Sequence, residues 1–210
     1  MKARHTIGRI AVLMSTMLLV GAGEAAAQLC ADVPVRPNRP ALAGAISFGE
    51  NSTSYGLAIQ ATPANHLVLD GGYSAADVEG MDVSHAVQAG AEYQRPLGTG
   101  LICPWAALKY AQVMDEGDWG DLASITAIIG ATIGKEVYTN GRFRLAPFVR
   151  ANNGFGSPIS RMTDDGWSDS YGASGGALVF LTDRFFGVGT VSVSEGGNTG
   201  ASIRLGWLLR

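Results

Sequence analysis

Residues 125–134 read Ile-Thr-Ala-Ile-Ile-Gly-Ala-Thr-Ile-Gly, and this stretch decides the fold. Ile125, Ile129 and Ile133, with the alanines between them, fall on one face of an extended chain. Threonine and glycine occupy most of the other face. An alternation with a period of two residues is typical of a β-strand with one apolar face. The stretch does not show the period of 3.6 residues that an amphipathic helix requires.

The same alternation recurs along the chain from residue 41 onward. Turn residues interrupt it, as at Asn140-Gly141, a pair that tolerates positive φ and favours a two-residue hairpin. The ten strands that the pattern predicts span 41–50, 53–62, 66–76, 82–95, 101–114, 121–138, 142–152, 170–182, 184–194 and 200–210. We therefore expect an all-β chain of consecutive hairpins.

The connections between these strands alternate in kind. Short turns at 63–65, 96–100, 139–141 and 183 alternate with polar loops, most of them longer, at 77–81, 115–120, 153–169 and 195–199. An even number of strands then places both chain ends on the side of the short turns. This pattern predicts an antiparallel up-and-down transmembrane β-barrel of an outer membrane, with about ten strands and eight as the alternative count. A soluble β-sandwich also has short strands, but nothing in that fold makes short and long connections alternate along the chain.

Charged and aromatic residues are also sorted by side. The acidic residues in or beside the expected outer loops are Glu50, Asp77, Glu79, Asp82, Asp115, Glu116, Asp118, Asp121, Asp164, Asp165, Asp169 and Glu195. The aromatic residues near strand ends are Phe48, Tyr55, Tyr73, Tyr110 and Tyr171 toward the loops, and Tyr93, Tyr138, Phe143, Phe185 and Trp207 toward the turns. Such rings are stable at a boundary between membrane and water, which favours a barrel over a soluble core.

The first 27 residues have the pattern of a secretory signal peptide. Lys2, Arg4 and Arg9 precede an apolar run over 10–20, and the small residues 25–27 follow it. The run is about 16 Å long as a helix, which is too short for a membrane anchor. We expect Sec export with cleavage after residue 27, then a periplasmic lead at 28–40 and the barrel at 41–210. A lipoprotein anchored at Cys30 is the weaker alternative, because Leu29 precedes it where a small residue is expected.

The composition excludes some classes of protein. The chain has 210 residues, a net charge of −3, 16% charged residues and 29 glycines. The slight negative charge and the lack of a basic patch argue against nucleic-acid binding. The low charge suits a wall that faces lipid, and glycine within strands suits a small barrel with a narrow lumen.

The segment from Ser202 to Arg210 alternates apolar and polar residues and carries Gly206, Trp207 and Leu209. With the hairpin pattern over 41–210, it resembles the small bacterial outer-membrane β-barrels, the OmpA-like proteins in the broad sense. The resemblance implies that these three residues belong to a signal read by the barrel-assembly machinery. It also implies a place in the outer membrane of a Gram-negative-type bacterium, among its lipid and lipopolysaccharide. The chain departs from the family by ending on Arg210 instead of an aromatic residue.

Cys30 and Cys103 are the only cysteines. Disulfides persist in exported proteins, and the expected topology places both residues on the periplasmic side. We therefore predict a disulfide that pins the lead to the rim of the barrel as a partial plug. The alternative is two unpaired thiols.

The predicted inner face carries the polar residues Gln60, Asp70, Gln88, Glu92, Lys109, Arg144, Arg150 and Arg204. In a barrel of this size they are expected to pair into a network that fills the lumen, or else to line a narrow pore. The strand 101–114 is ambiguous, because Trp105 and Tyr110 face lipid together only if a bulge intervenes.

The sequence predicts no enzyme, no cofactor and no metal centre. Beyond the signal peptide only His66 and His85 remain, and neither stands in a motif of an outer-membrane protease or deacylase. We expect a membrane scaffold or narrow pore whose acidic loops attract divalent cations. The alternatives are a soluble exported β-barrel that binds a small apolar ligand and a hydrolase of envelope lipids.

Overall fold

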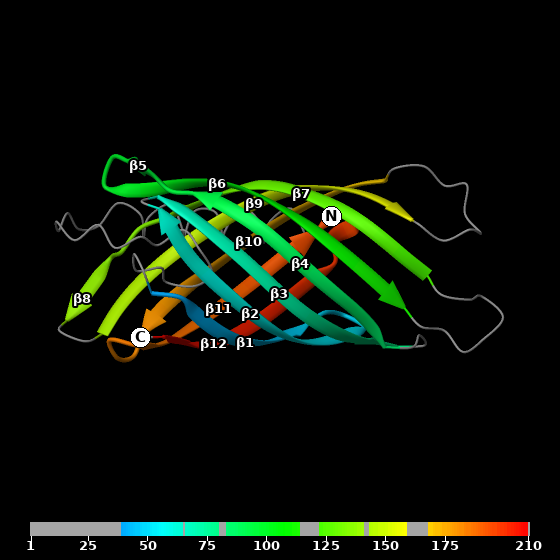
Figure 1. The fold of residues 1–210 in the computed structure, drawn as a ribbon, viewed down its shortest axis with the longest axis horizontal. Helices are drawn as coiled ribbons and strands as arrows, with labels where there is room; N and C mark the ends of the chain where they lie inside the picture. The colour runs from blue at the N-terminus through cyan, green and yellow to red at the C-terminus, as the bar shows by residue number, and fades with distance from the viewer. Residues whose placement is uncertain are drawn as a thin grey trace.

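The computed structural model describes residues 39–64, 66–79, 83–113, 122–140, 143–158 and 168–209. The expected signal peptide and most of the lead, Cys30 included, lie outside these residues. Ten long antiparallel strands form a closed barrel (Figure 1). They are β1 (Ala41–Phe48), β2 (Ser52–Ala64), β3 (Leu67–Val78), β4 (Ser84–Tyr93), β6 (Gly100–Val113), β7 (Leu122–Gly134), β9 (Phe143–Pro158), β10 (Ser168–Phe180), β11 (Phe185–Ser194) and β12 (Thr199–Leu208).

Each long strand pairs with its neighbours in sequence, and the last strand closes the ring on the first. The closing pair runs from Ala41 opposite Leu208 to Phe48 opposite Ala201. Closure leaves no unpaired edge, so the backbone hydrogen bonds of the wall are made between strands. The predicted up-and-down barrel of ten strands is thus confirmed, and eight strands is the wrong count.

The two ends of the barrel differ. At one end, which we call the turn end, β1 begins and β12 finishes, and the short strands β5 (Arg95–Leu97) and β8 (Tyr138–Asn140) extend two hairpins. This end is on the left in Figure 1. The opposite end, the loop end, carries the connections from β1 to β2, β3 to β4, β6 to β7 and β9 to β10. It also carries the 3-10 turn η1 (Glu195–Gly197) between β11 and β12.

The largest difference from the predicted strand boundaries is at the end of β9. The segment 153–158, expected as the start of a long loop, continues β9 to Pro158. Asn153 lies opposite Ile129 of β7 and Tyr171 of β10, so the ladder is made on both sides. Asparagine and glycine disfavour strands, but pairing with two neighbours overrides the local preference.

The outer wall is apolar around the whole barrel. Every long strand contributes at least one large apolar or aromatic side chain that is exposed to the exterior. Leu57, Leu108 and Ile129 lie in the middle of the wall, and Phe48, Tyr55, Tyr73, Tyr110 and Tyr171 lie toward the loop end. The alternation that made the strands recognisable therefore directs the apolar face outward. Among the described residues, no helix is long and apolar enough to cross a membrane.

Candidate functional site in the barrel lumen

The strand β6 shows how the alternation of residues places every second side chain in the lumen. Cys103 and Ala107 are buried, Trp105 and Lys109 line a cavity, and Tyr110 is exposed on the other face. The register of β6 is continuous against both of its neighbours. Trp105 therefore points into the lumen, and no bulge is needed for Tyr110 to face outward.

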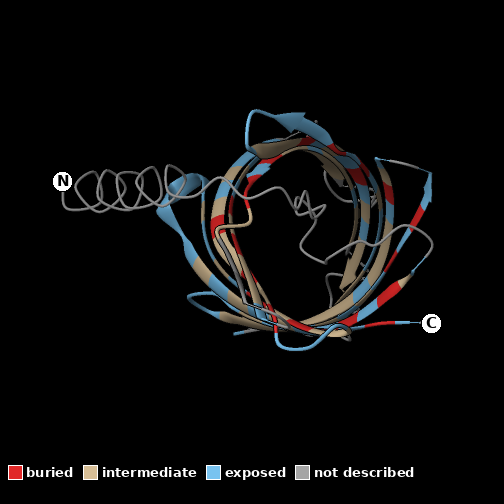
Figure 2. Cartoon of the chain, turned by 90° about the vertical axis from the view of Figure 1, so that its left-hand side faces the viewer, coloured by how far each residue is buried: buried red, intermediate tan, exposed pale blue. Residues whose placement is uncertain are grey.

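The turn-end half of the lumen is shielded from solvent. Every long strand contributes a buried inward position there, and the red segments in Figure 2 recur around the ring. On the five neighbouring strands from β9 to β1 these positions form one apolar cluster: Ala41, Ala43, Ala146, Phe148, Leu178, Phe180, Phe186, Val188 and Leu208. On the strands from β2 to β7, and just beyond β4 and β7, the buried positions include the polar residues Gln60, Thr62, Glu92, Gln94, Thr132 and Lys135. One side of this half is thus apolar, and the other side combines polar residues with Val68, Cys103 and Ala107.

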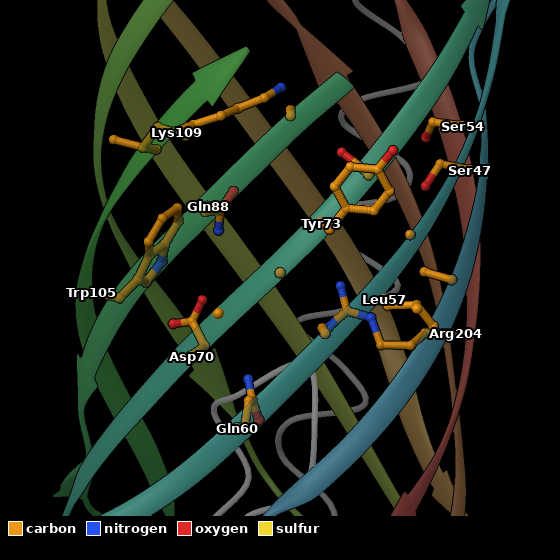
Figure 3. A pocket seen from close by; sticks show the side chains of 18 of the residues that line it. Ser47, Ser54, Leu57, Gln60, Asp70, Tyr73, Gln88, Trp105, Lys109 and Arg204 are labelled. Atoms are coloured by element: carbon orange, nitrogen blue, oxygen red, sulfur yellow. The ribbon is translucent and has the colours of Figure 1, made fainter. Parts of the chain in front are cut away.

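The loop-end half of the lumen is hollow. A cavity of about 400 Å³ opens there (Figure 3), lined mostly by small or polar side chains such as Ser47, Ser54 and Ser74. A second hollow of about 400 Å³, against β9 to β12, shares Arg150 and Arg204 with the first. We call these two hollows together the vestibule.

Seven of the eight polar residues expected on the inner face line the first cavity. They are Gln60, Asp70, Gln88, Glu92, Lys109, Arg150 and Arg204. Figure 3 shows Gln60 and Asp70 on neighbouring strands, with Lys109 on the far side of Trp105 from Gln60. The eighth, Arg144, lies closer to the turn end, where its Cζ atom is 4.0 Å from the centre of the Phe180 ring. The fold brings seven of them to one cavity and sets Arg144 against the apolar cluster.

Trp105 is the centre of a contact that joins three strands. The Cζ atom of Arg150 lies 4.7 Å from the centre of the indole ring, and Arg150 Nε donates a hydrogen bond of 3.0 Å to Thr132 Oγ1. Trp105 and Gly130 are directly opposite in the register of β6 and β7. A Cβ atom at position 130 would lie 2.8 Å from Trp105 Cε2 and 2.5 Å from the Ala151 carbonyl oxygen. Only glycine leaves room for the indole here.

Several buried polar atoms at the turn end have no hydrogen-bond partner within the described part of the chain. They include the acceptor oxygens Gln60 Oε1, Thr62 Oγ1 and Gln94 Oε1, and the donor Trp105 Nε1 nearer the vestibule. A buried polar atom without a partner costs about 1–3 kcal/mol. Thr62, Gln94 and Thr132 were not among the inner-face residues predicted from the sequence. The inward parity of Thr62 and Thr132 was visible in the alternation, but nothing in the sequence marked them as buried.

Cys103 and the predicted assembly-signal residues of the C-terminal strand lie toward the turn end of the barrel. Cys103 is fully buried with its side chain toward the lumen, and Cys30 lies outside the described residues, so their disulfide stays a prediction. Gly206 is buried on the inner face of β12, and Trp207 lies outside, with its ring centre 6.0 Å from that of Phe185. Leu209 donates its backbone N–H to Pro40 O at 2.8 Å, which ties the end of the barrel to its beginning.

His66 and His85 lie apart from one another. Neither belongs to a cluster of possible metal ligands among the described residues. His85 Nδ1 lies 2.6 Å from Tyr73 Oη on the outer wall, and the His66 ring lies against Tyr93 at the turn end. Within the described ranges, no group of three or more His, Cys, Asp or Glu side chains stands close enough to hold a metal ion.

Comparison with known proteins gives the fold alone. No protein-family profile matches the chain, and no curated protein matches it. Among solved structures, the β domain of the Bordetella autotransporter BrkA is similar, with a TM-score of 0.51 and 11% identity over 81% of this chain and 98% of that one. A KdgM porin has a TM-score of 0.47 and 11% identity, over 81% and 99% of the two chains. The N-terminal barrel of Pseudomonas aeruginosa OprF has a TM-score of 0.39 and 11% identity, over 82% and 98%.

Proposed function

We propose that this chain, an outer-membrane β-barrel by fold, is an envelope scaffold whose lumen is closed at the turn end and forms a vestibule at the loop end. The observation that carries the proposal is the complete ring of buried inward positions at the turn end. An open diffusion channel needs water along the whole lumen, and a ring of shielded side chains interrupts it.

The apolar outer wall supports a place in the membrane. Exposed side chains such as Leu57 and Ile129 are unfavourable in water and favourable against acyl chains. The aromatic residues toward the loop end suit a membrane boundary. We expect the protein to remain in the membrane fraction after washing with alkaline carbonate. Release into the supernatant would instead favour a soluble barrel that binds a small apolar ligand.

The proposal orients the turn end toward the periplasm and the loop end toward the outside, because short turns are periplasmic in barrels of this kind. The described acidic residues that lie exposed at the loop end are Glu50, Asp77, Glu79, Asp169 and Glu195. The other acidic residues of the expected loops lie outside the described ranges. An acidic outer rim would attract Ca²⁺ or Mg²⁺, which also bind the phosphates of lipopolysaccharide.

Conductance in a planar bilayer tests the closed lumen. We expect the purified, unreduced protein to show no steady channel at voltages where an open porin conducts. A narrow pore is the second candidate, because the cavity is polar and carries three basic side chains, Lys109, Arg150 and Arg204, against Asp70 and Glu92. Steady channels with a preference for anions would support the pore and contradict the scaffold.

Two further expectations belong to the proposal. The scaffold is not an enzyme, and incubation with radiolabelled lipopolysaccharide is expected to release no acyl chain beyond the level of a vesicle-only control. Sec export with cleavage after residue 27 is checked by the N-terminal sequence of the mature protein, which is expected to begin at Gln28. An N-terminal lipid on Cys30 would contradict that expectation.

A further inference from the structure

We propose that the vestibule binds a small hydroxylated anion, a molecule with several hydroxyl groups and one phosphate or carboxylate group. Arg150 and Arg204 hold the charged group, and the serine and threonine hydroxyls of the wall hold the rest of the ligand. The inference rests on the proposed function and assigns a class of ligand to the vestibule. It makes the closed barrel a binding protein of the cell surface.

Arg150 and Arg204 border the junction of the two hollows. Arg150 is on β9 and Arg204 is on β12, with β10 and β11 between them. Both residues line both hollows. Figure 3 shows the guanidinium of Arg204 directed from the wall into the cavity. A ligand at the junction can therefore meet two guanidinium groups that come from different parts of the wall.

Two guanidinium groups select an oxyanion, and a phosphate before a carboxylate. A guanidinium presents five N–H donors in a planar fork, so it can hold a wall residue, as Arg150 holds Thr132, and a bidentate oxyanion as well. A phosphate ester offers three acceptor oxygens and a charge of about −1.5 to −2 at pH 7. A carboxylate offers two oxygens and a single charge, so it satisfies two guanidinium groups less well.

The charges on the wall of the vestibule favour an anion. Lys109 is a third cation on the first hollow, where the carboxylates are Asp70 and Glu92. Glu92 is only 5% exposed, and its Oε1 atom accepts a hydrogen bond of 3.5 Å from Gln94 Nε2, so this carboxylate belongs to the shielded half of the lumen. The described residues that line the second hollow include no acidic one. Cations therefore outnumber the carboxylates that face the open space.

The exposed acidic residues of the loop end oppose the entry of an anion only weakly. They lie in water, where salt of physiological concentration screens a charge beyond about 8 Å. The guanidinium groups lie inside a barrel whose wall has a low dielectric constant, and such a wall strengthens their field along the lumen. Attraction within the vestibule thus outweighs repulsion at its rim.

The rest of the wall offers hydrogen bonds to a polyhydroxylated ligand. Each hollow has a volume of about 400 Å³, a size typical of a site for one small molecule. The hydroxyl-bearing residues are Ser47, Ser54 and Ser74 in the first hollow, and Ser170, Ser174, Thr190, Ser192 and Ser202 in the second. A hydroxyl group both donates and accepts, so this wall suits the hydroxyl groups of a sugar. An apolar ligand would displace bound water without replacing its hydrogen bonds.

Titration calorimetry of the folded protein in detergent micelles tests the proposal. The probes are glucose 6-phosphate, glucuronate and glucose. We expect glucose 6-phosphate to bind most tightly, glucuronate to bind more weakly, and glucose to show no measurable binding. The affinity for glucose 6-phosphate should fall as sodium chloride is added, because salt screens the attraction.

Arg204→Gln should weaken the binding of glucose 6-phosphate about ten-fold or more, the usual loss of a charge-assisted hydrogen bond. Lys109→Gln should weaken it less, because Lys109 lines the first hollow and not the second. The matched control is Arg95→Gln, which removes the same charge at an exposed position of the turn end and should leave the affinity unchanged. The migration of unheated samples on gels shows whether each variant has folded.

The outcomes separate this inference from the proposed scaffold, because calorimetry does not depend on conduction. Equal affinities for glucose and glucose 6-phosphate, or an undiminished affinity in Arg204→Gln, would overturn the anion site. Tighter binding of glucuronate would overturn the preference for phosphate and support the oxyanion. If Arg204→Gln does not fold, Lys109→Gln and the salt dependence decide. A closed barrel that binds none of the probes would overturn this site alone, and steady channels with binding intact would overturn the closed scaffold alone.

Discussion

Arg150 lies over the face of Trp105 inside the barrel, with its Cζ atom 4.7 Å from the centre of the ring. The same guanidinium donates a hydrogen bond to Thr132 Oγ1. One side chain on β9 therefore contacts both β6 and β7, across two strand interfaces. The contact lies between the hollow vestibule and the shielded turn end, so it helps to form the floor of the vestibule.

Gly130→Ala is expected to destabilise the barrel by about 1–3 kcal/mol, the usual cost of overpacking. The new Cβ would press on Trp105 Cε2 and on the Ala151 carbonyl, both closer than 3 Å. Urea unfolding in lipid vesicles, followed by far-ultraviolet circular dichroism, measures the change. The matched control is Gly189→Ala, because a Cβ at position 189 meets nothing within 4 Å. Equal losses in the two variants would show that the indole contact does not matter.

Thr132→Val keeps the shape of a fully buried side chain but removes the oxygen that Arg150 Nε bonds. We expect a loss of about 1–3 kcal/mol, because a partly buried charged donor loses an acceptor. Thr199→Val, at an exposed position of the loop end, is the control and should change little. In the background of Arg150→Met, Thr132→Val should cost much less. An undiminished cost there would place the effect of Thr132 outside this hydrogen bond.

Leu57→Arg tests whether the outer wall meets lipid. Leu57 is 60% exposed in the middle of β2, and an arginine near the middle of a bilayer costs a barrel about 2–4 kcal/mol. On the surface of a soluble protein the same change is nearly neutral. Asn198→Arg, exposed at the loop end, is the control. The free energy of unfolding is measured in vesicles for both variants. Equal losses in the two would contradict a membrane-facing wall.

The sequence was sufficient for the faces of the strands but not for the contacts between them. Ile125, Ile129 and Ile133 could be assigned to one face because the period of a strand is two residues. Closure of the barrel then directs that face outward. Trp105 has the inward parity, yet its contact with Gly130 depends on the register between β6 and β7. Register is set by the pairing of whole strands, which no single segment reveals.

The boundary of β9 shows a second limit. Asn153 and Gly154 have the composition of a loop, and local preference ends the predicted strand at residue 152, directly before them. In the barrel they are paired on both sides, since β7 and β10 extend as far. Gln60 and Asp70, by contrast, were assigned to the inner face from parity alone, because each stands in a strand with a clear alternation. Polar residues in regular strands were predictable, and strand ends were not.

Gly206→Ala separates two roles of the C-terminal strand. The resemblance to outer-membrane barrels makes Gly206 part of an assembly signal, whereas the structure places it opposite Phe186, and a Cβ there would lie 2.8 Å from Phe186 Cε1. If packing is the reason for the glycine, Gly206→Ala should impair unassisted folding into lipid vesicles. Phe186→Leu should then restore folding, because it removes the ring that the new methyl meets.

Trp207→Ala supplies the contrasting case. Trp207 faces outward, 49% exposed, and contacts Phe185 rather than the lumen. We expect this variant to fold unassisted at nearly the wild-type yield, but to assemble more slowly when purified barrel-assembly machinery is present. Yields are read from the heat-modifiable band on gels, with and without the machinery. If Gly206→Ala behaves like Trp207→Ala and Phe186→Leu fails to rescue it, the glycine acts through recognition, and its packing against Phe186 is incidental.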